Sequence, residues 1–244
     1  MKVCVITDNK FLYDTLQEII SEKKYNHTFD FFCSRIGKPS PLKGILSEVR
    51  LKEENLFFFK SYDLFLSLHC KQIFPDELVN NVRCINVHPG LNPYNRGWYP
   101  QVFAILNKLP HGATIHEIDC HLDHGAIIAQ EKVEIHSWST SYTVYNEVQQ
   151  AEARLLRANI DAILSNSYTK SYPEIEGNVN YVKDFNALCE IHPNERVTWG
   201  EAIDRLRALS FKGYKNAYFI DGNGDKIWLD LRLELDEHTD CVGK

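Results

Sequence analysis

The sequence lacks several features that would mark a membrane, secreted or nucleic-acid-binding protein. In 244 residues no apolar run approaches the roughly 20 residues of a membrane-spanning helix. The cysteines are scattered without a C-x-x-C pair, so we expect free thiols and neither a zinc ribbon nor a disulfide framework. A net charge of -6 argues against a nucleic-acid partner, which needs a basic face. Residues 1–8 are typical of a first sheet strand, not of a signal peptide, so we expect a cytoplasmic protein with no membrane partner.

Three common nucleotide and hydrolase motifs are also missing. No G-x-G-x-x-G follows the first strand, which argues against a dinucleotide-binding dehydrogenase. No G-x-x-x-x-G-K-S/T occurs, which removes the P-loop fingerprint. No G-x-S-x-G occurs either, so the sequence offers no serine-hydrolase elbow.

What is present is an alternation of apolar strands with helical patterns. We expect strands at 2–7, 29–32, 62–69 and 82–87, with helices at 11–23 and from 74. A helix at 99–106, strands at 113–118 and 126–135 and a long amphipathic helix capped by Ser139 follow. This order predicts an α/β fold, a Rossmann-like, doubly wound and mostly parallel sheet with right-handed crossovers.

The pattern loosens after residue 167. We expect residues 1–167 to form the catalytic domain and residues 168–244 a small C-terminal α+β appendage, with a helix at 200–209. The appendage ends in a β-hairpin, 218–220 and 226–235, around the Gly-rich turn 221–224. Because an isolated hairpin is at best marginally stable, this one should dock on the main domain or on a partner subunit.

Two polar clusters can carry chemistry. Asn86 and His88 end an apolar strand and, being two residues apart, share one face at the edge where open α/β sheets bind ligands. A second turn, marked by Gly125, should hold Asp123 facing His88 and raise the pKa of the imidazole by favouring its charged form. An amide, an imidazole and a carboxylate suit acyl transfer to a nucleophile that a substrate supplies. Spacing alone leaves an ordinary structural role for these turn residues equally open.

A metal site is a competing interpretation of the same region. Its candidate ligands are His111, His116, His121, His124, Asp119 and Asp123. Their spacing fits no tight template such as H-E-x-x-H, and strand alternation divides them between two faces, so we expect no metal.

The motifs resemble those of the folate-dependent formyltransferases. Asn86-Val87-His88-Pro89, then Pro93 and Arg96-Gly97, then Leu122-Asp123-His124-Gly125-Ala126-Ile127 are similar to that family, which includes glycinamide ribonucleotide and methionyl-tRNA formyltransferases. The resemblance covers roughly residues 1–165 in element order. It implies that Asn86, His88 and Asp123 are the catalytic trio and that N10-formyltetrahydrofolate is the formyl donor.

The segment after His88-Pro89 narrows the resemblance. The family usually has Ser-Leu-Leu-Pro there, whereas residues 90–100 look like the sugar N-formyltransferases that act on nucleotide-linked 4-amino-4,6-dideoxy sugars, most often dTDP-linked. Residues 207–219 and the hairpin are similar to the short C-terminal part of those enzymes, where the hairpin contributes to a homodimer. The resemblance implies a product for bacterial surface polysaccharide (O-antigen). Purine-type formyl transfer and formyltetrahydrofolate hydrolysis are the rivals within the enzymes, and a nucleotide-sugar or folate binding module without activity is the alternative outside them.

The contact residues follow from the resemblance and from side-chain chemistry. By resemblance, the pterin lies against Ser67, Leu68, Ile73, Phe74, Cys120 and His121. For a nucleotide sugar, we expect Arg96 and Lys10 on phosphate, Tyr94, Trp98 or Trp199 stacked on the base, and Asn9 hydrogen-bonded to the ligand.

Overall fold

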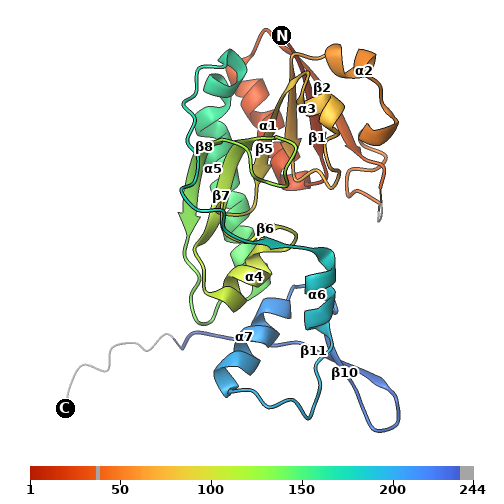
Figure 1. The fold of residues 1–244 in the computed structure, drawn as a ribbon, viewed down its shortest axis with the longest axis vertical. Coiled ribbons are helices and arrows are strands. Elements are labelled where there is room, and N and C mark those ends of the chain that lie inside the picture. Colours follow the sequence, from red (N-terminus) through yellow and green to blue (C-terminus); the bar gives the residue numbers. More distant parts are fainter. Residues whose placement is uncertain (37–38, 237–244) are drawn as a thin grey trace, which may run out of the picture.

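A computed structural model describes residues 1–36 and 39–236 (Figure 1). Its centre is a seven-stranded sheet in the order β3-β2-β1-β4-β5-β7-β8. The strands are β1 (Lys2–Thr7), β2 (Thr28–Ser34), β3 (Ser47–Val49), β4 (Leu64–Leu68), β5 (Arg83–His88), β7 (His111–Glu117) and β8 (Ile127–Val133). The first five strands in this order pair in parallel, and β7 and β8 join antiparallel. The predicted mostly parallel α/β sheet is confirmed.

Helices cover both faces of the sheet. One face carries α1 (Lys10–Lys23), α4 (Pro100–Asn107) and the long α5 (Ser141–Ser165), and the other carries the short α2 (Leu56–Lys60) and α3 (Asp76–Val79). Strand alternation divides the core accordingly: Val3 and Val5 of β1 join the first face, and Cys4 and Ile6 join the second. Because both faces are buried, the parallel strands are almost continuously apolar.

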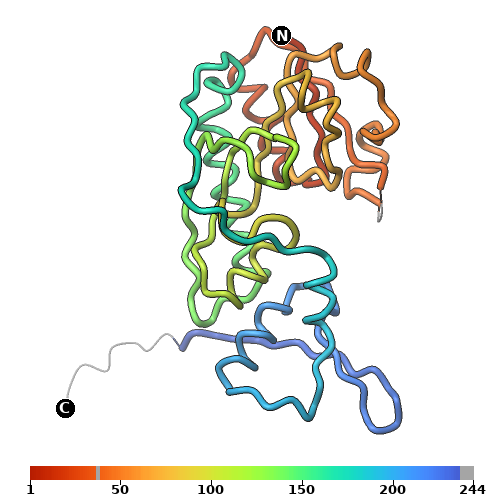
Figure 2. The backbone as a smooth tube through the Cα atoms, in the orientation of Figure 1, coloured from red at the N-terminus to blue at the C-terminus, as the bar shows by residue number. Residues whose placement is uncertain are grey.

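The chain after α5 runs back along the sheet before it enters the appendage (Figure 2). Ser171 pairs with Ile127 at the start of β8, and β9 (Val179–Asn180) pairs in parallel with the two-residue β6 (Arg96–Gly97). We call residues 168–180 the strap. Beyond it lie α6 (Val182–Cys189), α7 (Trp199–Leu209) and the antiparallel pair β10 (Ala217–Ile220) and β11 (Lys226–Leu229).

Two local predictions were wrong. The long helix is capped by Thr140, whose hydroxyl accepts from the Thr143 N–H in a capping box, and not by Ser139. Ser139 instead accepts from the backbone N–H of His136, one turn earlier. The last strand ends at Leu229. The alternating leucines after it form no strand, because no strand in the described part of the chain pairs with them.

Two other sequence expectations concern cysteines and membrane spans. The cysteines that the structure describes are free thiols, and Cys241 lies outside the described residues. Within residues 1–36 and 39–236, no helix has the length and apolar character needed to cross a membrane.

Candidate active site

The site lies where β5 ends, beside the loop that follows β7. Asp123 occupies that loop with a φ of 47°, a left-handed conformation that non-glycine residues rarely adopt. Two contacts hold it there: the Gly97 N–H donates to Asp123 Oδ2 at 3.1 Å, and Asn92 Nδ2 donates to the Asp123 carbonyl at 2.8 Å. A strained backbone that neighbouring groups hold in place is typical of functional positions.

The structure brings Asn86, His88 and Asp123 together. Asn86 Nδ2 lies 3.3 Å from Asp123 Oδ1, and His88 Nδ1 lies 3.7 Å from the same oxygen. The His88 and Asp123 side chains are only 5% and 12% exposed. The carboxylate therefore faces the imidazole, as the sequence predicted.

His116 is a fourth member that sequence reasoning assigned only to a metal. It is the register partner of Asn86 on the neighbouring strand. Its Nδ1 lies 2.6 Å from the Glu117 carbonyl, so Nδ1 carries the proton and Nε2 accepts from Asn86 Nδ2 at 3.2 Å. His116 thus fixes which way the Asn86 amide points. An antiparallel register between the predicted strands 82–87 and 113–118 would have placed His116 opposite Asn86.

Burial, and not Asp123, decides the charge of His88. Removal from water lowers the pKa of His88 to about 4, although Asp123 alone would raise it. Asp123 acts on the His88 pKa in the predicted direction, but the net pKa is lowered because burial outweighs the carboxylate. Burial would raise the pKa of Asp123, but His88, His116 and the Gly97 N–H together hold it below its usual value. At neutral pH the resting pair is a neutral imidazole beside a carboxylate.

The free nitrogen of His88 faces a space that a glycine leaves. Among the described residues, His88 Nε2 has no hydrogen-bond partner although it is buried. A Cβ at Gly90 would lie 2.5 Å from it, closer than real Cβ contacts allow. With Nδ1 toward Asp123, Nε2 holds the lone pair that can accept a proton. Gly90, which replaces the usual serine of the resembled family, keeps that atom clear.

The loop between β5 and α4 is held by buried polar contacts. Thr114 Oγ1 donates to the Gly90 carbonyl at 2.7 Å and accepts from the Asn92 N–H at 3.1 Å. Asn95 is fully buried, and its Oδ1 accepts from Asn107 at 2.9 Å and from Asn178 of the strap at 2.8 Å. The loop whose Asn92 and Gly97 donate to Asp123 is therefore held in place by buried contacts with β7, α4 and the strap.

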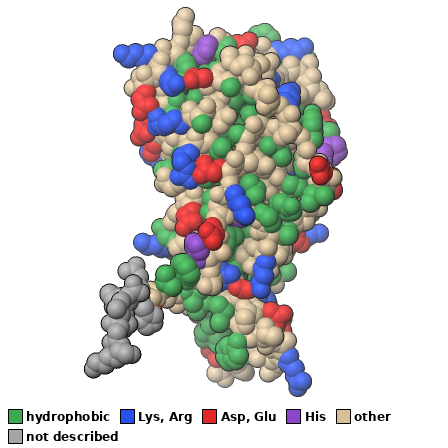
Figure 3. All heavy atoms as spheres, turned by 90° about the vertical axis from the view of Figure 1, so that its left-hand side faces the viewer, with side chains coloured by type: hydrophobic (Ala, Val, Ile, Leu, Met, Phe, Trp, Pro, Cys, Tyr) green, Lys and Arg blue, Asp and Glu red, His purple; other side chains and the backbone are tan. Residues whose placement is uncertain are grey.

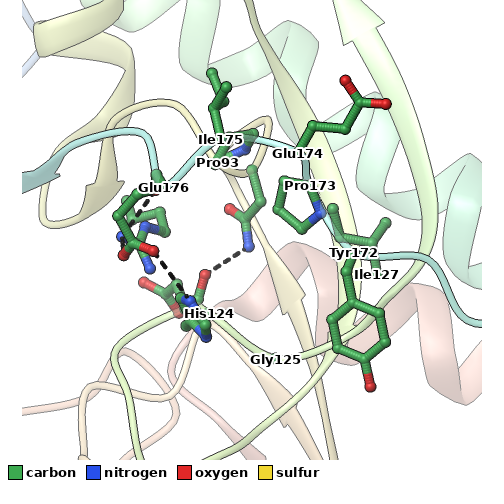
Figure 4. A pocket seen from close by; sticks show the side chains of 12 residues that line it. Pro93, His124, Gly125, Ile127, Tyr172, Pro173, Glu174, Ile175 and Glu176 are labelled. Atoms are coloured by element: carbon green, nitrogen blue, oxygen red, sulfur yellow. Dashed lines mark hydrogen bonds and ion pairs between the residues drawn. The ribbon is translucent and has the colours of Figure 1, made fainter.

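A cavity of about 200 Å³ opens beside Asp123 between this loop and the strap (Figure 4). The strap supplies residues 172–176, and the close-up shows the Glu176 carboxylate directed at His124. Arg96 Nη2 pairs with Glu176 Oε1 at 2.6 Å and also reaches the Glu176 carbonyl at 3.0 Å. Arg96 is nearly buried, so a phosphate would have to displace Glu176 to reach it.

The other residues that we expected to bind the nucleotide sugar are not all gathered around the trio. Asn9 is buried as the N-cap of α1, and its amide contacts Gln149, Tyr145 and His69. Lys10 is exposed and paired with Asp14. Tyr94 follows Asn92 in the site loop, Trp98 is partly exposed after β6, and Trp199 begins α7 in the appendage with 85% of its surface exposed.

The expected folate contacts divide into buried and exposed positions. Ser67 and Leu68 are buried in β4 and offer only backbone, and the Phe74 side chain packs in the core. Ile73 is 70% exposed, and Cys120 and His121 are exposed beside the Asp123 turn. Backbone at the end of β4 and the side chain of Ile73 are thus available to a ligand.

Part of the proposed metal cluster does assemble. Asp119, His121 and His124 each bring one ligand atom to within 4.8 Å of the others. His116 instead holds Asn86, and His111 is buried with neither ring nitrogen partnered in the described part of the chain. His124 also contacts Glu176, so these side chains already have partners within the protein.

Two family models match the chain. Residues 54–160 match the model described as formyl transferase, and residues 184–235 match the N-formyltransferase dimerization C-terminal domain. A dTDP-4-amino-4,6-dideoxyglucose formyltransferase of Mycobacterium tuberculosis is 42% identical over 241 residues, which cover 99% of this chain and 100% of the relative. The chain belongs to the formyltransferase family.

Solved structures of formyltransferases agree with this assignment. A 4-N formyltransferase from Francisella tularensis superposes with a TM-score of 0.91 at 47% identity, covering 96% of this chain and 98% of the other. The sugar 3N-formyltransferase WlaRD, solved in the presence of dTDP and 5-N-formyl-THF, has a TM-score of 0.71 at 25% identity, covering 91% and 83%. The predicted family and formyltransferase fold are confirmed.

Proposed function

We propose that this chain transfers a formyl group from N10-formyltetrahydrofolate to the amine of dTDP-4-amino-4,6-dideoxyglucose. The observation that carries the proposal is the 42% identity with the mycobacterial formyltransferase of that name over essentially the whole of both chains. The trio supports it, since no side chain among Asn86, His88 and Asp123 has to act as a nucleophile. The sugar amine supplies the nucleophile.

We propose Asn86, His88 and Asp123 as the catalytic residues. The amine attacks the formyl carbon, a new C–N bond forms, and Asn86 donates from its amide to the oxygen that becomes negative. His88 Nε2, neutral and without a partner in the described residues, accepts the proton that the attacking nitrogen loses. The C–N10 bond then breaks and N10 receives a proton through His88. Asp123 stabilises the imidazolium while it carries that proton.

The Asn86 amide is already hydrogen-bonded before any substrate binds. Both Asn86 N–H groups point at acceptors in the resting structure, His116 Nε2 and Asp123 Oδ1. Donation to the developing oxyanion therefore requires one of these contacts to lengthen. The contact with Asp123, at 3.3 Å, is the longer one and is the contact that we propose gives way.

We propose the following contacts for the two substrates. The pterin would lie against the end of β4, Ile73 and the Cys120–His121 segment. The nucleotide sugar would approach Asn9, Lys10 and the loop of Tyr94, Arg96 and Trp98, and Trp199 stays a candidate for stacking on the base. The residues need no metal for these steps, because the oxyanion donor and proton carrier are side chains.

We further propose a cytoplasmic homodimer that assembles through the appendage. The match of residues 184–235 to an N-formyltransferase dimerization domain supports this, and so does an exposed apolar surface there. The net charge of -6 gives no support to a nucleic-acid partner. A formylated sugar nucleotide would serve bacterial surface polysaccharide synthesis.

The test is a transfer assay with N10-formyltetrahydrofolate and dTDP-4-amino-4,6-dideoxyglucose. Glycinamide ribonucleotide and a reaction without acceptor run in parallel. We expect formylation of the sugar alone. Activity on the ribonucleotide only, or release of formate without acceptor, would overturn the assigned acceptor while leaving the trio in place.

A further inference from the structure

A second imidazole–carboxylate pair lies at the end of β4, next to the strand that carries His88. His69 Nε2 lies 2.7 Å from Glu152 Oε1 and 2.8 Å from Glu152 Oε2. Glu152 comes from the middle of α5, and its side chain is 0% exposed. A carboxylate this deeply buried is rarely retained without a use, because removing it from water is costly.

The other nitrogen of His69 is also constrained. Asn9 Oδ1 accepts from the Leu12 N–H as the cap of α1, which fixes the direction of the Asn9 amide. Asn9 Nδ2 then lies 3.1 Å from His69 Nδ1 and 2.7 Å from Gln149 Oε1. The ring of His69 is therefore held from both sides, with Nε2 donating to Glu152 and Nδ1 accepting from Asn9.

The backbone of His69 shows what this arrangement maintains. Its φ is 55°, in the left-handed region that few non-glycine residues adopt. The turn there sends the chain from the end of β4 into residues 70–73 at the ligand-binding edge of the sheet. The hydrogen bonds of the imidazole with Asn9 and Glu152 offset the energetic cost of this left-handed backbone conformation.

The following residues are tied down one after another. The Lys71 N–H donates to Asp8 Oδ2 at 3.0 Å. Gln72 Oε1 accepts from the Leu51 N–H at 2.8 Å, and Gln72 Nε2 donates to the Val49 carbonyl at 3.0 Å. These contacts leave residues 69–72 little freedom.

The next residue, Ile73, presents a large apolar side chain to solvent with 70% of its surface exposed. An apolar residue on an anchored loop offers a preformed contact to a flat, partly apolar ligand. Binding to an anchored loop costs less conformational entropy than binding to a mobile one.

We infer that Glu152, through His69, is a positioning residue that holds the 69–73 loop in the shape that binds the pterin of the folate co-substrate. This inference rests on the proposed function, because it assigns that loop to the formyl donor and not to the sugar nucleotide. Glu152 does not touch either substrate. It acts by fixing the His69 ring, and with it the left-handed turn.

The test compares binding of 5-formyltetrahydrofolate by calorimetry among three variants and the wild type. Glu152→Gln keeps an oxygen that accepts from His69 Nε2, and we expect its Kd within threefold of wild type. The double variant His69→Asn with Glu152→Leu tolerates the positive φ and leaves no buried carboxylate, and we expect its Kd to rise at least tenfold. Glu147→Gln, on an exposed turn of the same helix, is the matched control and should bind as wild type.

Steady-state kinetics add a readout that general loosening of the fold would not give. We expect the double variant to raise the KM for the formyl donor at least tenfold and the KM for the sugar nucleotide by a smaller factor, because Asn9, one of the groups assigned to the sugar, contacts His69. A double variant with native circular dichroism and an unchanged Kd, or one that raises only the KM for the sugar, would overturn the inference. Should the double variant fail to fold, a Glu152→Gln protein with a Kd raised more than tenfold would overturn it, since that variant keeps the hydrogen bond.

The same experiment separates the inference from the proposed function. A wild-type protein that binds 5-formyltetrahydrofolate but formylates no sugar would contradict the proposed reaction, and the variants would still test the loop. A wild-type protein that does not bind the folate would contradict both. Normal sugar formylation together with unchanged folate binding in the double variant would contradict the inference alone.

Discussion

The main domain and the appendage differ in how much of their apolar surface one chain covers. In the main domain the sheet is buried on both faces by packed apolar side chains. In the appendage Tyr181, Trp199, Tyr214, Ile227 and Trp228 are all exposed. Figure 3 shows hydrophobic side chains gathered on the lower part of the molecule, where Figure 1 places the appendage. These exposed side chains of the appendage are the surface that the proposed homodimer would cover.

The largest effect should come from the main domain, at Asp123. We expect Asp123→Asn to lower turnover about 10²- to 10⁴-fold, because the amide cannot stabilise His88 once it carries a proton. Formyl transfer to the sugar nucleotide measures this. Asp119→Asn, four residues earlier and partly exposed, is the control and should stay within a few-fold of wild type. Near-normal turnover of the Asp123→Asn variant would remove Asp123 from the mechanism.

A smaller loss is expected at Gly90. A side chain there would crowd His88 Nε2, which lies 2.5 Å from the position of its Cβ. We expect Gly90→Ser to lower kcat about tenfold to a hundredfold by displacing the imidazole from its proton-transfer position. Gly222→Ser, at a glycine with nothing within 4 Å of a new Cβ, should leave kcat unchanged. Equal kcat values for both variants would show that His88 does not need the space.

A third change tests the appendage directly. We expect Trp228→Glu to shift the protein from dimer to monomer in sedimentation velocity, because a charge would replace an apolar contact between copies. Trp228 is 42% exposed, whereas Phe57 of the main domain is 87% exposed. Phe57→Glu should therefore leave the dimer intact if position, and not exposure alone, defines the interface. Dissociation by both changes, or by neither, would break the comparison between the two regions.

The smallest effect should be a pH dependence of the main domain's stability. Burial lowers the pKa of His88 to about 4 and that of His111 to about 3, from 6.5. Between each lowered pKa and 6.5, the histidine of the unfolded chain binds a proton that the folded chain does not bind. The free energy of unfolding therefore falls as the pH drops below 6.5, and this contribution to stability is fully present above pH 6.5. Each histidine contributes a slope of about 1.4 kcal/mol per pH unit.

Urea unfolding at pH 7 and pH 5 measures this slope. His111→Leu should remove one of the two contributions and flatten the dependence, because His111 is buried without hydrogen bonds in the described residues. An imidazole NMR titration should find His88 still neutral at pH 5.5. A His88 that becomes charged near pH 7 would show that Asp123 outweighs burial after all.

Much of the main domain could be predicted from its residues. The strand ending at His88 and the turn at Gly125 are local signals, and they placed the imidazole and the carboxylate correctly toward each other. The direction of the net pKa shift of His88 could not be predicted, because it depends on how deeply the folded protein buries the ring. His116 required the register between β5 and β7, which are neighbours in the sheet but not consecutive along the chain.

The charged and aromatic ligand contacts stay predictions, and the sequence carries less information about them for a physical reason. Arg96 was expected on phosphate for the chemistry of its guanidinium, but its partner Glu176 in the structure lies 80 residues later. The pairing of His69 with Glu152 likewise joins residues 83 apart. Spacing along a chain predicts which side chains share a strand or a helix face, and it gives little information about polar partners from distant elements.

The strap has a consequence for how such enzymes can be recombined. It is the connection to the appendage and also one wall of the cavity beside Asp123, with Glu176 paired to Arg96. A chimera joined at residue 168 would exchange that wall together with the appendage. Joining after Asn180 would keep β9 with its native β6. The useful crossover point in this chain therefore lies after β9, well beyond the end of its last main-domain helix.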